Sequence, residues 1–541
     1  MKNKKAFISG AIVLMLAGLI VRMFGFVYRV YLSNLIGSEG MGLFQLISPV
    51  YSLVIMTLTS GISIAVSRLV AQETARGHYV NIRRITLSGL IVVVVSGVVI
   101  SLLIYFNIDF VVKYLLKDPR TYSSILFLIP CIPIIAAASV LKGYFYGIQN
   151  VTPTAYSQVV EQIVKISLVL FVLKKFVSFG LEYTCAAATA AIAIGEMANL
   201  LVLIIMYRPS IRKITANENK RGLMRKRRIM IEIFKIAVPV STNRLITSFM
   251  SAIELIMIPA RLLSGGMDYQ TSMELYGKLT GMAMPVIFFP AIVTSSLATT
   301  LVPAISEALS LKNFKTVNYR ISKSIQLTFV LGFLFTAIFI AYPNEISNSI
   351  YKRESVAELL HLLSFTCLFF YLQQTLHGIL HGLGQEGKIL KNAVIGYAIR
   401  IAFVYFLLPI YGIKSYVVAM IVSSAVGCIF NLALVMKTTG MSIDIRNWII
   451  KPGIVCVAMI LTSKYVYSFF TIFIEQKSFV SIVTVMGNFI LGAILMVLVG
   501  VISKREIFKM MGLKNSKLDL KLNKKNGHKK IIHRTLKRKK T

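Results

Sequence analysis

Long apolar stretches recur along the whole chain and constrain its fold more than any other feature. A helix needs about 20 apolar residues to cross a bilayer, and about fourteen stretches meet that length. They cover approximately residues 7–33, 42–70, 84–106, 121–146, 154–174, 182–207, 232–259, 272–303, 321–342, 356–380, 389–410, 413–436, 449–470 and 480–502. Only 15% of the 541 residues are charged, and the mean hydropathy is +0.75. We therefore expect an all-α polytopic membrane protein with about fourteen transmembrane helices, which excludes a soluble enzyme, a secreted protein and a disordered scaffold.

The basic residues predict how the chain is oriented in the membrane. There are 59 Lys and Arg against 21 Asp and Glu, and the two richest basic segments are residues 208–228 and the tail from Lys504 onward. Cytoplasmic loops carry the excess of Lys and Arg, and both segments are cytoplasmic only if the number of spans is even. We expect a multi-pass protein of the cell membrane with both termini in the cytoplasm. The basic loop and tail are expected to attract anionic lipids rather than nucleic acid.

The sequence contains no motif that predicts enzymatic chemistry. Walker A, GxSxG and HExxH patterns are all absent, and the five cysteines lie singly inside apolar segments. Neither a disulfide framework nor a metal site is expected. We predict a protein that is not an enzyme and that needs no cofactor or metal.

An internal repeat predicts two related halves. The segment from Leu141 to Gly147, LKGYFYG, matches the segment from Leu376 to Gly382, LHGILHG, at an offset of 235 residues. Two halves with the same orientation imply a pseudo-twofold axis along the membrane normal, with a substrate site between them near mid-membrane. The predicted parts are an N-terminal six-helix bundle at 1–207, a basic cytoplasmic linker at 208–231, a C-terminal six-helix bundle at 232–438, two extra helices at 439–503 and a basic cytoplasmic tail at 504–541.

Ionisable residues inside the predicted spans are candidates for a functional site, because burying a charge in the membrane is costly. Lys165, Arg244 and Arg400 each fall roughly 17 Å from the cytoplasmic ends of their helices, near the midplane, and Arg22 lies slightly further out. Arginine presents a fixed fork of donors suited to phosphate. An excess of buried cations therefore favours an anionic substrate, and we predict that these four residues bind it. Other candidate cavity residues are Arg29, Lys278 and Glu196.

Structural roles are the alternatives for these charges. Glu161 with Lys165, and Glu274 with Lys278, are spaced i,i+4, so each pair could neutralise itself on one helix. Arg22, Arg244 and Arg400 have no acid at that spacing, and their alternative is an ion pair with another helix. Glu196 has no evident partner on its own helix. An unpaired membrane acid is what a cation-coupled multidrug exporter would require.

Four sequence blocks resemble a known family. They are IGSEGMGLFQ from Ile36 with SRLVAQE from Ser67, GYFYGIQNVTPTAYSQVVE from Gly143, LYGKLTGMAMP from Leu275 continuing to Glu307, and QQTLHG from Gln373 with Gly382–Gly384. Together they resemble the stage V sporulation protein B family of the multidrug/oligosaccharidyl-lipid/polysaccharide (MOP) exporter superfamily. The resemblance implies two six-helix bundles that work by alternating access, often with two added helices. Similarity to the MurJ lipid II flippases is weaker. Their first helix carries an arginine, Gly-Phe and a second arginine; here Arg22 and Gly25-Phe26 match, whereas Arg29 is displaced by one position.

The residues and the resemblance together predict a flippase. Its substrate would be undecaprenyl-pyrophosphate-linked peptidoglycan precursor, lipid II, for the spore cortex. The pyrophosphate would meet the cations between the halves, and the prenyl tail would stay in lipid, along the helices at 449–470 and 480–502. The alternatives are a cation-coupled multidrug exporter, an exporter of another lipid-linked polysaccharide unit, and a scaffold that recruits peptidoglycan-synthesis proteins through its basic tail.

Overall fold

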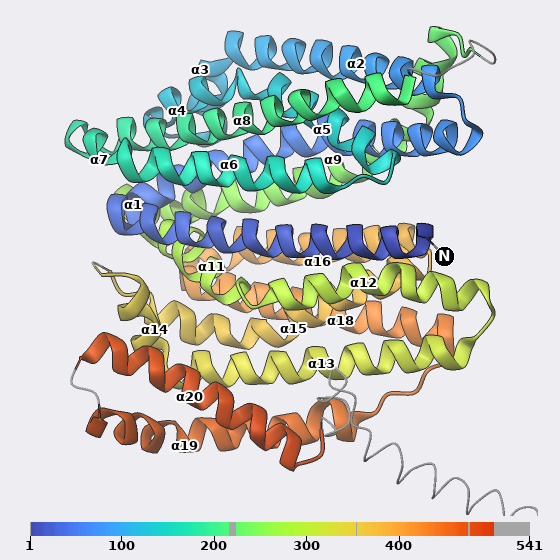
Figure 1. Ribbon diagram of the computed structural model, residues 1–541. Helices are drawn as coiled ribbons and strands as arrows, with labels where there is room; N and C mark the ends of the chain where they lie inside the picture. The colour runs from blue at the N-terminus through green and yellow to red at the C-terminus, as the bar shows by residue number, and fades with distance from the viewer. Residues whose placement is uncertain (1, 216–222, 353, 474–475, 502–541) are drawn as a thin grey trace, which may run out of the picture.

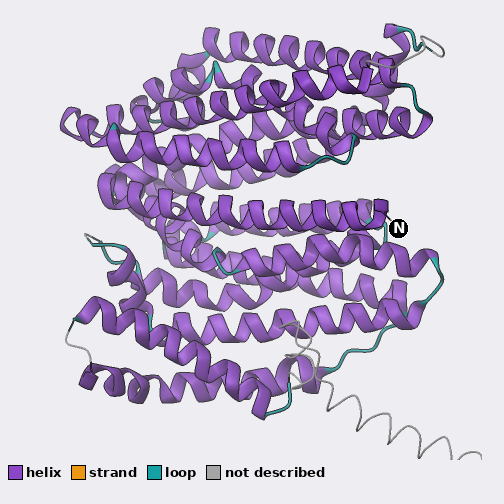
Figure 2. Cartoon of the chain, in the orientation of Figure 1, coloured by secondary structure: helices purple, strands orange, loops and turns teal. Residues whose placement is uncertain are grey.

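The computed structural model describes residues 2–215, 223–352, 354–473 and 476–501, and within these ranges the chain forms helices and turns without a strand (Figures 1 and 2). This confirms the predicted all-α class. The helices up to the basic linker are α1 (Lys2–Arg76), α2 (Tyr79–Phe106), α3 (Ile108–Phe110), α4 (Tyr122–Leu128), α5 (Cys131–Gly147), α6 (Thr152–Phe171), α7 (Leu173–Phe176) and α8 (Leu181–Thr215). Two 3-10 turns, η2 (Pro119–Thr121) and η3 (Val177–Phe179), and a π-helical segment, η1 (Val111–Leu116), lie among them.

The rest of the described chain is also helical. Its α-helices are α9 (Lys226–Ser264), α10 (Tyr269–Tyr276), α11 (Met284–Phe288), α12 (Ala291–Ser310), α13 (Phe314–Ala341), α14 (Pro343–Ile350), α15 (Ala357–Gly382), α16 (Glu386–Phe406), α17 (Leu408–Tyr411), α18 (Ile413–Thr439), α19 (Lys451–Phe473) and α20 (Lys477–Leu498). Two further π-helical segments are η4 (Gly277–Ala283) and η5 (Arg446–Ile450). The predicted tail at 504–541 and part of the predicted linker lie outside the described residues.

The described helices can be compared with the fourteen predicted membrane spans. Eleven described helices are long and apolar enough to cross a membrane, or twelve if the pair Pro119–Leu128 and Cys131–Gly147, bent by 41°, is one span. The expected count of fourteen is not confirmed, for two reasons. The stretches at 7–33 and 42–70 are the two arms of α1, which is interrupted at Gly37 but enters the eleven as one element. Helix α6 is not among the eleven, since Glu161, Gln162 and Lys165 make it comparatively polar.

Helix α1 folds back on itself at Gly37. This residue has φ +70° and ψ −174°, a left-handed conformation that glycine adopts without a Cβ clash. Residues 2–36 form a first arm and residues 38–76 a second arm, and Figure 1 shows both arms reaching the same end of the molecule. We call the opposite end, where Gly37 lies, the Gly37 end. The connections between α2 and α4, α6 and α8, α9 and α10, and α13 and α15 also lie at this end (Figure 1).

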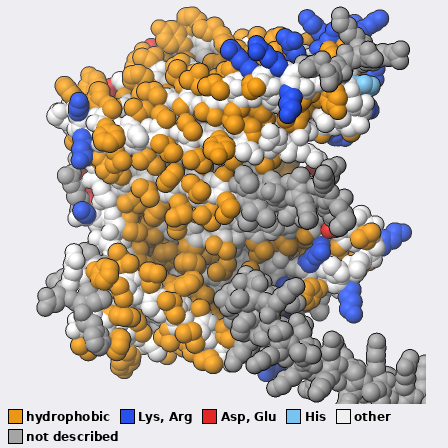
Figure 3. Space-filling view, viewed as in Figure 1, with side chains coloured by type: hydrophobic (Ala, Val, Ile, Leu, Met, Phe, Trp, Pro, Cys, Tyr) orange, Lys and Arg blue, Asp and Glu red, His pale blue; other side chains and the backbone are white. Residues whose placement is uncertain are grey.

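Two groups of helices lie on either side of the first arm of α1 (Figure 1). One group contains the second arm of α1 with α2, α5, α6 and α8, and the other contains α12, α13, α15, α16 and α18. Helices α19 and α20 pack outside the second group against α13. Apolar side chains cover much of the surface in Figure 3, as expected for a protein surrounded by lipid.

Matching contacts in the two groups agree with the sequence repeat. In the first group, a Cβ added to Gly143 would lie 2.6 Å from the Ser63 carbonyl oxygen. In the second, a Cβ added to Gly378 would lie 2.6 Å from the Ala298 carbonyl oxygen. Both residues of the second pair are 235 positions after those of the first. The repeated glycines therefore allow the same close helix contact twice, whereas the exact division into parts remains a prediction.

Helix α9 connects the two groups. Ile229, Ile233 and Ala237, in its first half, belong to the apolar core of the first group. Ser241 Oγ donates a hydrogen bond to the Thr57 carbonyl oxygen, 2.9 Å away on the second arm of α1. The second half of α9 packs instead against α16. A relative movement of the two groups must therefore bend or tilt α9.

Candidate functional site

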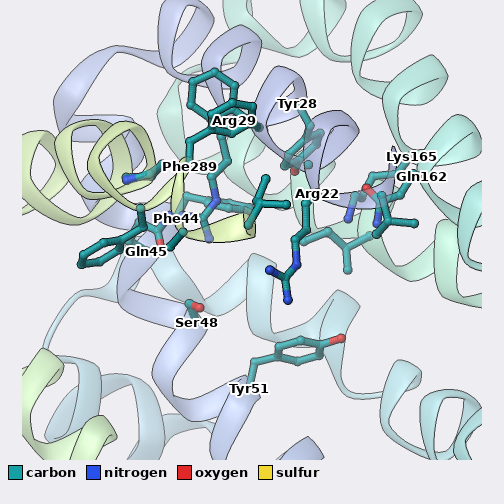
Figure 4. Close-up of a pocket in the computed structure, with 18 of the residues that line it drawn as sticks. Arg22, Tyr28, Arg29, Phe44, Gln45, Ser48, Tyr51, Gln162, Lys165 and Phe289 are labelled. Carbon is teal, nitrogen blue, oxygen red and sulfur yellow. The ribbon is translucent and has the colours of Figure 1, made fainter. Parts of the chain in front are cut away.

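A cavity of about 580 Å³ lies between the two groups of helices (Figure 4). Both arms of α1 and helices α4, α6 and α8 line one side, and α11, α12 and α15 line the other. The first arm contributes Arg22 and Arg29, the second contributes Gln45 and Ser48, and α6 contributes Gln162 and Lys165. The cavity therefore lies where the sequence repeat predicts a substrate site, between the two groups of helices.

The charge of the cavity is strongly positive. Arg22, Arg29 and Lys165 all line it, and none of its lining residues in the described chain is Asp or Glu. Arg22 Nη1 donates a hydrogen bond to Ser295 Oγ of α12, on the opposite side of the cavity. Lys165 Nζ lies 5.2 Å from the centre of the Tyr28 ring, a cation–π contact that leaves its donors free for a ligand. Three cations without a lining carboxylate favour an anionic occupant.

Two enclosed donors in the cavity have no hydrogen-bond partner within the described structure. They are the Tyr28 hydroxyl and Gln45 Nε2, whose side chains are 5% and 7% exposed. A buried donor without a partner costs about 1–3 kcal/mol. A ligand with several acceptor oxygens would offset that cost. A phosphate group offers such oxygens together with the negative charge that the three cations require.

Aromatic side chains make the other part of the cavity wall. Phe26 and Phe289 lie with ring centres 4.6 Å apart, and Phe288 stacks on Phe370 at 4.1 Å. Phe26 comes from α1, Phe288 and Phe289 from α11 and the turn after it, and Phe370 from α15. The cavity thus combines a cationic, polar wall with an apolar one, which suits an amphipathic anion.

The structure places the other predicted cations outside this cavity. Arg400 Nε pairs with Glu254 Oε1 at 2.7 Å, its Nη1 donates to Ser423 Oγ at 3.2 Å, and its guanidinium lies 4.5 Å from the Tyr397 ring centre. Tyr416 OH also donates to Glu254 at 2.8 Å. Of the two roles considered for Arg400, the ion pair between helices is therefore the one observed in this conformation. Arg244 is exposed on α9 and is not among the lining residues.

Neither of the ion pairs expected within one helix forms as predicted. Lys278 pairs instead with Glu354, which lies beyond α14, at 3.5 Å. Glu161 accepts hydrogen bonds from Gln162 Nε2 and Asn199 Nδ2, while Lys165 faces the cavity. Asn199 Nδ2 also donates to Glu196 at 3.1 Å, so its amide links the two carboxylates. The i,i+4 spacing permits a pair, but the neighbouring helices decide where each side chain goes.

Sequence reasoning missed the neutral members of the site. Tyr28, Gln45, Gln162 and Ser295 carry no charge, and nothing in their spacing distinguishes them from packing residues. The aromatic residues Phe288 and Phe289 belong to an apolar stretch that is equally typical of a core. Only the arrangement of α1, α6, α11 and α12 around one cavity identifies them.

Polar contacts close the cavity at the Gly37 end. Glu354 Oε1 accepts from the backbone N–H of Ser38 at 2.7 Å, and Asn34 Nδ2 donates to the Ile350 carbonyl at 2.8 Å. Tyr269 OH donates to Asp118, which also pairs with Arg120. Each of the first three contacts joins α1, or the segment between α2 and α4, to the other half of the chain. The structure therefore represents a state in which the two groups meet at the Gly37 end.

The tyrosine contact is held in place by the start of α10. Asp268 caps this helix by accepting from the backbone N–H of Thr271 at 2.9 Å. Hydrogen bonds from the Thr271 hydroxyl and N–H hold the pKa of Asp268 below its usual range. The cap therefore stays ionised at neutral pH and fixes the helix end that carries Tyr269.

Two comparisons with known proteins place the chain in a family. The sequence model described as "Polysaccharide biosynthesis protein" matches residues 7–309. Stage V sporulation protein B of Bacillus subtilis (strain 168) is 30% identical over 466 residues, which cover 85% of this chain and 89% of that protein. The chain belongs to the polysaccharide biosynthesis protein family. This confirms the resemblance read from the sequence blocks.

The chain is also similar to lipid II flippases. The model "Lipid II flippase MurJ" matches residues 282–504. The protein of that name from Bacillus subtilis (strain 168) is 24% identical over 81% of this chain and 84% of its own length. The two models overlap at residues 282–309 and together cover residues 7–504.

Solved structures show the same fold. The inward closed conformation of lipid II flippase MurJ aligns with a TM-score of 0.67, covering 90% of this chain and 99% of that one at 14% identity. The inward-facing conformation of a MATE transporter aligns with a TM-score of 0.64, covering 79% and 100% at 16% identity. Both of these structures are in inward states. The chain therefore shares the fold of these two proteins, and its eleven or twelve candidate spans among the described residues make it a multi-pass membrane protein.

Gly277 packs closely against α1 at the Gly37 end, and we expect this contact to stabilise the closed state. A Cβ added to Gly277 would collide with the Ser38 carbonyl oxygen, where η4 crosses the second arm of α1. Overpacking of this kind costs about 1–3 kcal/mol. We expect Gly277→Val to shift the protein away from closure at the Gly37 end. The measurement is labelling of a Ser48→Cys cavity reporter by a membrane-impermeant thiol reagent added from that side.

The native protein is a suitable background for this labelling, because all five of its own cysteines are buried. Gly387→Val is the matched control, since a Cβ there meets nothing within 4 Å. Faster labelling in Gly277→Val than in the control is the expected result. Equal protection of the reporter thiol in both variants would show that the glycine contact does not control closure.

Proposed function

We propose that this protein is a flippase for a lipid-linked glycan, and that it moves undecaprenyl-pyrophosphate-linked peptidoglycan precursor, lipid II, across the cytoplasmic membrane for spore cortex synthesis. The observation that carries the proposal is the cavity between the two groups of helices, with Arg22, Arg29 and Lys165 and no lining carboxylate among the described residues. A pyrophosphate would bind these cations and the free donors of Tyr28 and Gln45. The names of the relatives, a lipid II flippase and a sporulation protein, support the choice of substrate and its role.

Alternating access is the proposed mechanism. In the described state the Gly37 end is closed, and we assign that end to the outer side of the membrane, with both termini in the cytoplasm. The basic loop at 208–228 then lies inside, which agrees with the rule for cytoplasmic loops. The membrane potential would help to return the empty cationic cavity to the cytoplasmic side, since each charge is worth roughly 2.3 kcal/mol per 100 mV.

Reconstitution tests the proposal. Purified protein in liposomes that contain fluorescent lipid II should make the lipid accessible to a quencher on the opposite leaflet faster than empty liposomes do. The Arg22→Ala variant, at equal protein content, should lose this activity. Quenching at the rate of empty liposomes with the wild-type protein would refute lipid II as the substrate.

A cation-coupled multidrug exporter remains the second candidate, because Glu161 and Glu196 share one amide donor, that of Asn199. If the protein were such an exporter, Glu196→Gln would abolish efflux of a cationic dye. We expect no dye efflux by the wild-type protein, and we expect Glu196→Gln to change lipid II transport less than Arg22→Ala does. The two assays on the same membranes separate the candidates. Dye efflux that depends on Glu196 would favour the exporter.

Deleting residues 504–541 tests the scaffold alternative. These residues are proposed to contact anionic lipid heads and, in the scaffold alternative, peptidoglycan-synthesis proteins. A flippase needs the cavity more than the tail, so we expect most of the transport activity to survive the deletion, provided that the protein still reaches the membrane. Complete loss of function with normal membrane levels would favour the scaffold.

A further inference from the structure

A second hollow lies on the other side of the second arm of α1 and is separate from the cavity described above. It measures about 300 Å³ and lies between that arm, η1, α9 and α10. We call it the α1–α9 groove. Among the described residues, Lys117 is the one charged member of its walls. The other lining residues are almost entirely apolar, and they include Leu46, Val50, Phe249, Ala260 and Tyr269.

The groove reaches the lipid-facing surface over one leaflet. Its α9 wall runs from Phe249 to Leu263, roughly 21 Å of helix, and half of a bilayer core is about 15 Å. Phe249 and Tyr114 are 53% and 61% exposed, so the groove is open to the bilayer. Lys117 and Tyr269 lie at the Gly37 end. The hollow therefore spans the leaflet on that side.

A cation lies at the mouth of the groove. Lys117 lines the groove and also an adjoining hollow, which it shares with Lys113, Asp109 and Tyr122. Both lysines are exposed. Lys117 has φ +58°, a left-handed conformation that is uncommon for a residue with a side chain. It ends η1, one of three π-helical segments in the described chain, and such segments occur often at functional sites.

The groove differs from the cavity in its place on α1. Gln45, Ser48 and Tyr51 face the cavity, whereas Leu46, Val50 and Leu53 face the groove. The helix therefore separates the two sites. A lipid whose phosphate occupies the cavity cannot lay its chain along the groove without passing around this arm. The groove suits a lipid that has already left the cavity.

We infer that the α1–α9 groove holds the polyprenyl chain of the translocated lipid-linked glycan, with its phosphate groups against Lys117 and Lys113. This inference rests on the proposed function and adds a second binding site for the lipid on the Gly37 side. Charge complementarity at the mouth and one leaflet of apolar wall below it fit a long-chain anionic lipid. Tyr269 lines the groove and also bonds to Asp118. A chain in the groove thus touches a residue that closes the Gly37 end.

Photolabelling of the full-length protein tests the inference. The probe is undecaprenyl phosphate with a diazirine in its chain, added to the protein in phosphatidylcholine nanodiscs. We expect labelled peptides from residues 249–263. Ala260→Trp should fill the groove and remove this label. Lys117→Glu should weaken it about tenfold, the effect of one lost charge-assisted hydrogen bond. Ile205→Trp, at a position 67% exposed on α8, is the matched control and should leave it unchanged.

The outcomes separate this inference from the proposed function. Label on α19 and α20 but not on residues 249–263 would overturn the groove while leaving the flippase intact. The same holds if excess phosphatidylglycerol displaces the probe, since the groove would then be a phospholipid site. No specific label anywhere in the wild-type protein would contradict the proposed function, and the inference with it.

Discussion

Alanine in place of Arg22, Arg29 or Lys165 is expected to abolish or strongly reduce lipid II transport. Each side chain lines the cavity, and each would lose charge-assisted hydrogen bonds to the pyrophosphate, worth about 1.5–3 kcal/mol. That energy corresponds to a loss of roughly 10- to 150-fold in affinity. The measurement is the rate of lipid II transport in liposomes, with each variant reconstituted at equal protein content.

Lys414→Ala is the matched control for these variants. Lys414 pairs with Glu358 at 2.8 Å on an exposed surface, where both side chains are about two-thirds exposed. Its removal takes away one cation without touching the cavity, and surface pairs of this kind contribute about 0–1 kcal/mol. If the control lost transport as the cavity variants do, net charge rather than the cavity would be the cause.

Arg244→Ala belongs in the same series. The residue lies outside the cavity in this state, on the helix that must move when the two groups move. A loss as large as that of Arg22→Ala would place Arg244 on the substrate route in another state. Unchanged transport would remove it from the set of binding residues that the sequence suggested.

Arg400→Ala is expected to act on stability rather than on substrate binding. Without the guanidinium, the Glu254 carboxylate would keep only Tyr416 as a partner among the described residues, although its side chain is 4% exposed. Breaking a buried ion pair by removing one partner costs about 3–5 kcal/mol. We expect a lower thermal unfolding midpoint in detergent and less protein in the membrane. Arg22→Ala should keep near wild-type stability in the same assay.

A double variant isolates the pair. Arg400→Met combined with Glu254→Gln leaves no unpaired charge, so it should recover most of the stability lost in Arg400→Ala. Full stability of Arg400→Ala together with lost transport would return Arg400 to the substrate-binding set.

Much of the fold follows from the sequence because the bilayer limits the alternatives. Apolar stretches of about 20 residues must become helices in lipid, and the all-helical class follows from that alone. The repeat at an offset of 235 residues has a physical counterpart in the glycine contacts of Gly143 and Gly378. The number of spans was harder to predict. Gly37 breaks α1 into two arms that enter the count as one element, and α6 is less apolar than the other long helices because it carries the cavity residues Gln162 and Lys165.

The candidate site could be predicted only in part. Arg22 and Lys165 stand out because charges are rare in apolar helices, and the structure brings both to one cavity. Arg400 carries the same signal but pairs with Glu254, which is 146 residues away in sequence. Spacing along one helix reveals partners on that helix and none on others. Tyr28 and Gln45 carry no signal at all, because their importance comes from being enclosed without a partner in the described structure.

Rescue of growth tests the central claim most directly. The protein would be expressed in a bacterium whose own lipid II flippase can be switched off, with its level in the membrane measured in parallel. We predict growth with the wild-type chain and none with Arg22→Ala combined with Arg29→Ala at an equal membrane level. Growth supported by the double variant, or no growth with wild-type protein at a normal level, would contradict the assignment of the cationic cavity as a route for lipid II.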